Sequence, residues 1–177
     1  KGLGIIGQPD TEDTISAVID AYVAHLGLEV PKVDAREYRL HPGMREAVME
    51  ARSRQGFAVG LGTGNVRAGA KVKLDRVEIH DQFAFGGFGC DFEDRVALIR
   101  HGAQAGAARL GHPLEACRVV IIGDTPKDVA AAKGIGAETI GVGTGNFTPQ
   151  ALRDAGAEWA FADFAAPGAM EALLVGR

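Results

Sequence analysis

The sequence predicts an α/β fold, a doubly wound parallel sheet of Rossmann-like type that carries a small helical cap. Between residues 39 and 177, short apolar runs suited to strands buried on both faces alternate with amphipathic stretches of helical period. Strands separated in this way by helices form parallel sheets with right-handed connections and helices on both sides. The first 38 residues hold one long helical pattern and no strand. We therefore divide the chain into a partial helical cap, residues 1–38, and a core, residues 39–177.

Five apolar runs are expected to be strands. The run at 118–122 is the strongest of them, because it is almost wholly β-branched and ends in Gly123. The expected strands are 57–61, 82–85, 118–122, 139–142 and 159–161. Helical patterns in the core are expected at 44–54, 66–74, 94–110, 128–133, 149–155 and 167–174.

The pattern at residues 11–26 predicts the helix of the cap. Apolar side chains recur there with the period of one helix face, and Thr11 is a suitable N-cap. Glu12 and Asp13 favour the first turn, where the helix dipole attracts negative charge. The chain opens with Lys1, and residues 2–7 already read as a segment running into a helix. We therefore expect the chain to be part of a longer protein.

Composition excludes several classes of function. A formal net charge of −4 gives no electrostatic basis for binding nucleic acid, whose phosphates require a basic face. No apolar run is long enough to cross a bilayer, and nothing resembles a signal peptide. Cys90 and Cys117 lack the spacing of metal ligands, so unpaired thiols in a reducing, cytoplasmic setting are expected. Monomer and homodimer both stay open.

The turn after the first expected strand is a candidate anion site. Ligands of open α/β sheets bind at the carboxyl ends of the strands, and here the sequence reads Leu-Gly-Thr-Gly-Asn at 61–65. Thr63 offers a hydroxyl, and the next helix presents its N-terminal amides to an anion. The alternative is a plain glycine-rich turn.

The turn after the strongest strand is a candidate cation site. Asp124 stands at the end of the strand and Asp128 follows in the first turn of the next helix. Two converging carboxylates suit Mg²⁺, which prefers oxygen ligands. The alternative is helix capping by Asp124, with Asp128 favoured by the helix dipole.

Arg95 opens the long helix between these two turns. It could reach a bound phosphate or hold Asp124 and Asp128 in place. The alternative is a solvated arginine paired with Asp91 or Asp94. No metal-ligand spacing surrounds the histidines, which we expect at the surface: His80, His101 and His112.

The order of these features resembles the haloacid dehalogenase (HAD) superfamily over about residues 39–145. The Thr-Gly-Asn turn and the Gly-Asp-Thr-Pro-Lys-Asp segment look most like the phosphoglycolate-phosphatase-like branch. The resemblance implies that Thr63 and the amides of Gly64 and Asn65 bind phosphate, and that Arg95 neutralises charge. It further implies that Asp124 binds Mg²⁺ and that Asp128 orients Arg95 or a metal-bound water.

The family's nucleophile motif, Asp-x-Asp after the central strand, is absent from the sequence given. The resemblance therefore implies that the core at 39–177 lacks its first strand, which would leave an open edge in the middle of the sheet. The nearest match, at residues 10–13, has the wrong spacing and is expected to start a helix. The resemblance implies a Mg²⁺-dependent phosphatase that cleaves a small phosphorylated metabolite through an aspartyl-phosphate, and this chain alone is expected to be inactive. A non-catalytic member that binds phosphate or a partner is the alternative. The substrate is left open, as is the choice between phosphatase and mutase.

Overall fold

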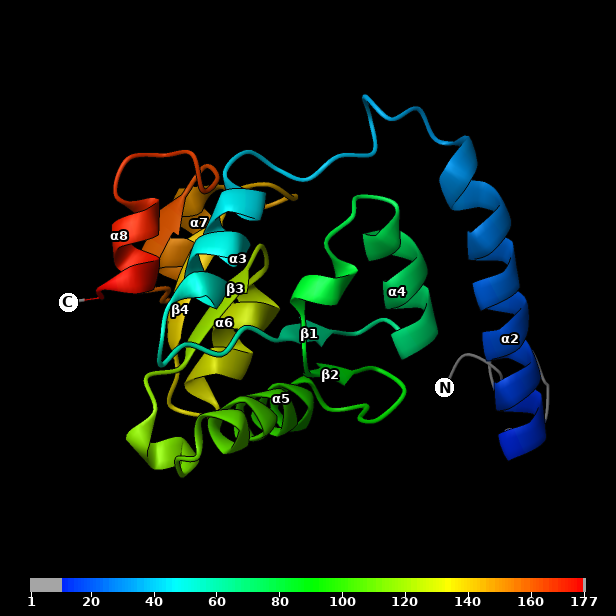
Figure 1. The fold of residues 1–177 in the computed structure, drawn as a ribbon, viewed down its shortest axis with the longest axis horizontal. Coiled ribbons are helices and arrows are strands. Elements are labelled where there is room, and N and C mark those ends of the chain that lie inside the picture. Colours follow the sequence, from blue (N-terminus) through cyan, green and yellow to red (C-terminus); the bar gives the residue numbers. More distant parts are fainter. Residues whose placement is uncertain (1–10, 177) are drawn as a thin grey trace.

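The computed structural model describes residues 11–176, and the segment predicted at residues 2–7 lies outside this range. Two parallel sheets form the core (Figure 1). One has three strands, β3 (Val120–Gly123), β4 (Glu138–Val142) and β5 (Trp159–Phe161), in the order β3-β4-β5. The other pairs β1 (Leu61–Thr63) with β2 (Gly86–Phe88). The α/β class with parallel strands is confirmed.

Helices cover both faces of the three-stranded sheet. On one face Ile140 and Val142 of β4 pack with residues of α3 (Met44–Ser53) and α8 (Ala169–Leu174). On the other face Ala160 of β5 packs with α6 (Pro126–Lys133) and α7 (Pro149–Asp154). β4 lies between β3 and β5 and is buried from Thr139 onward. This half of the molecule has the doubly wound arrangement that the alternating pattern predicts.

The two-stranded sheet is built on close backbone approach. A Cβ on Gly86 would lie 2.3 Å from the carbonyl oxygen of Leu61, and one on Gly87 would lie 2.1 Å from that of Leu98. Leu98 belongs to α5 (Arg95–Leu110), which packs along β2. Only glycine permits these contacts, because any side chain would displace β1 or α5.

Two predicted strands are misplaced. The run at 57–61 is irregular up to the start of β1 at Leu61. The run at 82–85 is also wrong, because its first residue ends a 3₁₀ turn, His80–Gln82, and the strand begins only at Gly86. Apolar patterning identified side chains that could be buried, whereas backbone contact with α5 fixes where these strands lie.

The two sheets lie side by side along α5. A Cβ on Gly62 of β1 would meet the side chain of Ile99, and Ile121 of β3 packs on the cluster that contains Ile99. Within residues 11–176 no strand pairs with the second edge of β1 or of β3. We call these the unpaired edges. The doubly wound sheet, expected from the sequence to lack its first strand, is divided in the described residues into two sheets, with β1 and β3 at the facing edges.

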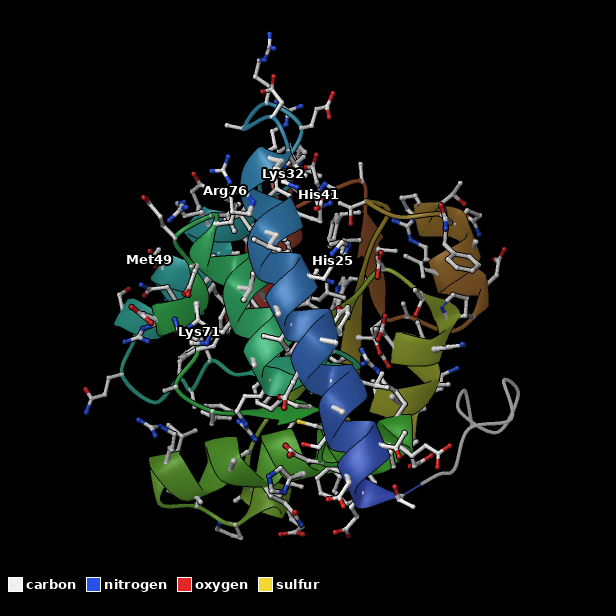
Figure 2. The ribbon with its side chains drawn as sticks, turned by 90° about the vertical axis from the view of Figure 1, so that its right-hand side faces the viewer. His25, Lys32, His41, Met49, Lys71 and Arg76 are labelled. Atoms are coloured by element: carbon white, nitrogen blue, oxygen red, sulfur yellow. The ribbon has the colours of Figure 1, made fainter. Side chains whose placement is uncertain are left out.

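The helix expected in the cap is α2 (Glu12–Glu29), and it stands at one side of the molecule (Figure 1). Thr11 caps it by accepting a hydrogen bond from the Thr14 amide, as predicted. In Figure 2, α2 crosses in front of α4 (Arg67–Asp75), on which it packs. A 3₁₀ turn, Val30–Lys32, ends it, and a connection that contains a hydrogen-bonded turn at residues 35–37 leads to α3. No helix between residues 11 and 176 combines the length and the hydrophobicity that a membrane span requires.

Candidate active site

The turn after β1 is held by its own hydrogen bonds. The Oγ1 atom of Thr63 accepts a hydrogen bond from the Asn65 amide at 3.1 Å. The carbonyl of Asn65 accepts another from the Gly89 amide, just past β2, at 2.9 Å. Because the Thr63 oxygen acts as an acceptor inside the turn, its hydroxyl hydrogen stays available for an anion. The Asn65 amide, by contrast, is already used within the turn.

The turn after β3 leads into α6 through a capping box. Thr125 is the N-cap, and its hydroxyl accepts a hydrogen bond from the Asp128 amide. The Oδ2 atom of Asp128 in return accepts from the amide and hydroxyl of Thr125, at 3.2 and 2.8 Å. Asp128 is only 6% exposed. The alternative of capping by Asp124 is therefore wrong, because Thr125 is the N-cap and Asp128 completes the capping box.

Arg95 connects the two turns. It is the first residue of α5, and its Nη2 atom donates to the Oδ1 atom of Asp128 at 2.6 Å. Its Nη1 atom lies 3.8 Å from where a Cβ on Gly64 would be. The guanidinium therefore lies between the end of β1 and the start of α6. A buried carboxylate beside a fixed guanidinium is a strong, charge-assisted contact.

The acidic neighbours of Arg95 have other partners. Asp94 caps α5 by accepting from the Ala97 amide at 2.8 Å. Asp91 pairs with Arg67 at 2.8 Å, and the Arg67 guanidinium also lies over the ring of Phe88. The alternative that Arg95 pairs with Asp91 or Asp94 is therefore wrong.

Asp124 has a carboxylate with space around it. Within residues 11–176 it makes no hydrogen bond or ion pair. A Cβ on Gly145 would lie 2.3 Å from its Oδ2 atom, so any larger residue at this position after β4 would clash with this oxygen. Sequence reasoning missed Gly145. The signal was present, because Gly-Thr-Gly-Asn stands at 62–65 and again at 143–146, both times at the end of a parallel strand.

The described residues supply part of a Mg²⁺ site. Asp124 fits as one ligand, because its carboxylate is uncommitted and room is kept beside it. Asp128 does not fit as a second, since one of its oxygens accepts from Arg95 and the other from Thr125. Mg²⁺ requires near-octahedral oxygen ligands, usually including one or two carboxylates with waters or phosphate oxygens. Among the described residues, Asp124 is therefore the side-chain ligand that fits at this position.

A second acidic group lies at the far end of α4 from the Thr63 turn. The side chains of Asp75, His80 and Asp81 converge there, with ligand atoms within 4.8 Å of one another. The prediction that His80 has no partner at metal-ligand spacing is wrong, because its Nδ1 atom lies 3.2 Å from Asp81 and 3.7 Å from Asp75. Lys71 binds the same Asp75 carboxylate at 2.5 Å, and this hydrogen bond raises the pKa of Lys71. The ammonium group already supplies the positive charge here.

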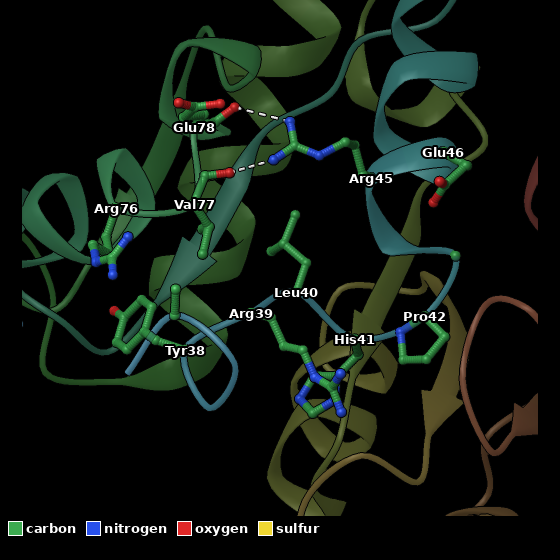
Figure 3. A pocket seen from close by; sticks show the side chains of 12 residues that line it. Tyr38, Arg39, Leu40, His41, Pro42, Arg45, Glu46, Arg76, Val77 and Glu78 are labelled. Atoms are coloured by element: carbon green, nitrogen blue, oxygen red, sulfur yellow. Dashed lines mark hydrogen bonds between the residues drawn. The ribbon is translucent and has the colours of Figure 1, made fainter. Parts of the chain in front are cut away.

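A shallow hollow lies between the connection after α2 and the end of α4 (Figure 3). Tyr38, Arg39, His41 and Arg76 are among its lining residues. Arg45 crosses it to donate to the carbonyls of Val77 and Glu78. None of the predicted site residues lines this hollow.

The family comparison covers the second half of the core. Residues 99–166 match the HAD-hydrolase-like family. This range contains Asp124 and Asp128, whereas Thr63 and Arg95 precede it. No curated protein matches the chain significantly.

Solved structures extend the likeness in fold beyond this range, to between 77% and 97% of the chain. A protein described as a β-phosphoglucomutase from Thermotoga maritima is 26% identical, with a TM-score of 0.56 over 77% of this chain and 58% of that one. A haloacid-dehalogenase-like hydrolase from Streptococcus pneumoniae is 18% identical, with a TM-score of 0.60 over 85% and 66%. A haloacid-dehalogenase-like protein of unknown function from Agrobacterium tumefaciens is 19% identical, with a TM-score of 0.58 over 97% and 71%.

The chain thus spans less than two thirds of the first two of these proteins. The resemblance predicted from the sequence is confirmed at the level of the superfamily. Nothing in these likenesses tests the phosphoglycolate-phosphatase-like branch.

Proposed function

We propose that this chain, which resembles the haloacid dehalogenase superfamily in these comparisons, forms the phosphate- and metal-binding part of a Mg²⁺-dependent phosphatase. The substrate would be a small phosphorylated metabolite of phosphoglycolate-like type. One observation carries the proposal: Arg95 lies between the hydroxyl-bearing turn after β1 and the Asp128 carboxylate after β3. An anion bound at these strand ends would meet a donor and a cation together.

Thr63 and Gly64 are proposed to hold the phosphoryl group. The turn uses the Thr63 oxygen as an acceptor from Asn65, which leaves its hydroxyl hydrogen free to donate to an anion. Asn65 contributes by shaping the turn, because its amide is already bonded to Thr63. Arg95 would offset the charge of the phosphoryl oxygens, and Asp128 would keep the guanidinium in place through the 2.6 Å contact.

Asp124 is proposed as the ligand that this chain gives to Mg²⁺. When bound, the ion would reduce the repulsion between an anionic nucleophile and the dianionic phosphate. The nucleophile is proposed to be the first aspartate of an Asp-x-Asp on a further strand that pairs with the unpaired edges of β1 and β3. Its carboxylate oxygen would bond to phosphorus as the ester oxygen leaves and takes a proton from the second aspartate. Water would then hydrolyse the acyl phosphate.

The alternative is a non-catalytic protein that shares this site. In either case the 177 residues given contain no Asp-x-Asp. A protein without that carboxylate would bind phosphate at Thr63 and Arg95 and release no product.

The experiment is a phosphate-release assay on p-nitrophenyl phosphate with the complete gene product and with the present chain, each with and without Mg²⁺. We expect release from the complete product only, and only with Mg²⁺. Absence of release from the complete product at every metal concentration would reject the enzyme, and inorganic phosphate binding would then favour the alternative. The same phosphate-release measurement with β-glucose 1-phosphate as substrate distinguishes a phosphatase from a mutase. A phosphatase releases free phosphate, whereas a mutase forms glucose 6-phosphate and releases little phosphate.

A further inference from the structure

The helix α2 is hydrogen-bonded directly to the candidate phosphate-binding turn. The hydroxyl of Tyr22 donates to the Oδ1 atom of Asn65 at 2.8 Å, across 43 residues of sequence. Tyr22 lies near the middle of α2, and Asn65 lies between β1 and α4. The bond therefore joins a helix at the side of the molecule to the end of a core strand.

Asn65 is the residue on which the shape of this turn depends. Its amide donates to Thr63 and its carbonyl accepts from Gly89. With the side chain bonded to Tyr22, three polar groups of Asn65 are used, each by a different segment. A rotation of Asn65 would move its amide away from Thr63 and change the direction of the Thr63 hydroxyl.

Packing holds Tyr22 where it can make this bond. A Cβ on Gly69 of α4 would lie 3.1 Å from the ring of Tyr22 and 3.3 Å from the side chain of Leu26. The glycine thus lets α2 approach α4 closely. The Tyr22 side chain is still 37% exposed, so its position depends on α2 staying against α4.

We infer that Tyr22 is a positioning residue, which sets the Thr63–Asn65 turn for anion binding only while α2 is packed on α4. The inference rests on the proposed function for the nature of the ligand. Packing of α2 on α4 then favours the conformation of the turn that binds the anion. By linkage, an anion bound at the turn must in return favour packing of α2 on α4.

The test compares Tyr22→Phe with Tyr38→Phe in the complete gene product. Both substitutions remove one hydroxyl and keep the ring. Tyr38 is a matched control, because its hydroxyl also joins the N-terminal part of the chain to α4, at the carbonyl of Lys73, but is not bonded to the turn. Two quantities are measured: hydrogen exchange of the Asn65 backbone amide by NMR, and the dissociation constant of inorganic phosphate.

In Tyr22→Phe we expect Asn65 amide exchange to accelerate about threefold to tenfold, the usual worth of one hydrogen bond. Phosphate binding should weaken over the same range. Tyr38→Phe should leave both quantities at the wild-type value. Added phosphate should slow exchange in residues 19–26 of the wild type and have less effect on them in Tyr22→Phe.

Unchanged Asn65 exchange in Tyr22→Phe would overturn the inference, as would equal effects of the two substitutions. A wild-type protein that binds no phosphate would instead overturn the proposed function. The exchange measurement needs no ligand and decides separately whether Tyr22 holds the turn.

Discussion

The two sheets are stabilised in different ways. The three-stranded sheet is filled by side chains, with Ile140 and Leu152 fully buried on its two faces. The two-stranded sheet is built from Gly62, Gly86 and Gly87, whose missing side chains let α5 and the neighbouring strand come close. Buried side chains therefore stabilise the three-stranded sheet, whereas close backbone contacts determine the position of β1 and β2. The candidate site draws its acidic residues from the first half and its hydroxyl turn from the second.

The largest expected effect tests the acidic end of the larger sheet. Asp124→Asn in the complete gene product should abolish Mg²⁺-dependent phosphate release, because the substitution removes the one uncommitted carboxylate at this position. Its folding should be unaffected, since Asp124 has no partner within residues 11–176. The measurement is kcat with p-nitrophenyl phosphate, with circular dichroism as the control for folding. An unchanged kcat would remove Asp124 from the mechanism.

The contrast between the buried core and the unpaired edge of β3 can be measured with two isoleucines. Ile140→Ala should lower the free energy of unfolding by about 2–5 kcal/mol, because it leaves a cavity in a fully buried site. Ile122→Ala, at a side chain that is 36% exposed, should cost about 1–2 kcal/mol. Chemical denaturation of the present chain measures both.

A reversed order would contradict the assignment of the core. In the complete gene product, a loss at Ile122 as large as that at Ile140 would show that a further segment covers the unpaired edge of β3.

The hydroxyl turn of the smaller sheet is tested by Thr63→Val, with Thr63→Ser as its control. Loss of one donor to a phosphoryl oxygen should raise the barrier for phosphate release by about 2–4 kcal/mol. The serine variant keeps the hydroxyl and should retain most of kcat/KM. If kcat/KM were the same in Thr63→Val and in the wild type, the Thr63 hydroxyl would not contact the phosphoryl group, and Thr63 would serve only to shape the turn.

The link between the two halves is tested by Arg95→Ala. Removing the guanidinium leaves the buried Asp128 oxygen without its partner. We expect the free energy of unfolding to fall by about 1–3 kcal/mol, less than for a fully buried pair because Arg95 is partly exposed. Arg67→Ala breaks an ion pair of the same type between more exposed partners, 58% and 31%, and should cost about 1 kcal/mol or less. Thermal unfolding of both variants measures the difference. If both substitutions lowered the free energy of unfolding equally, the Arg95–Asp128 pair would stabilise the protein no more than the exposed Arg67–Asp91 pair does.

The sequence predicted most of the larger sheet and little of the smaller one. The runs at 139–142 and 159–161 are strands because their side chains are buried, and burial is what apolar patterning reports. β2 escaped prediction because Gly86 and Gly87 carry no such pattern and are fixed by contact with α5, which no local pattern encodes.

The same distinction holds in the site. Thr63, Asp124 and Asp128 could be found, because each follows a strand whose end can be read locally. The partner of Arg95 lies 33 residues away, and that of Tyr22 lies 43 residues away. Such pairs are set by how helices pack, so a single sequence leaves several partners equally reasonable.

The central claim, that the ends of β1 and β3 bind one anion together, is tested most directly by titrating inorganic phosphate into the complete gene product with Mg²⁺ present. Backbone amide signals are followed by NMR at Thr63 and Gly64 and, separately, at Asp124 and Thr125. We expect both pairs to shift along one binding curve with the same dissociation constant. Shifts confined to one pair, or two different dissociation constants, would contradict the shared site.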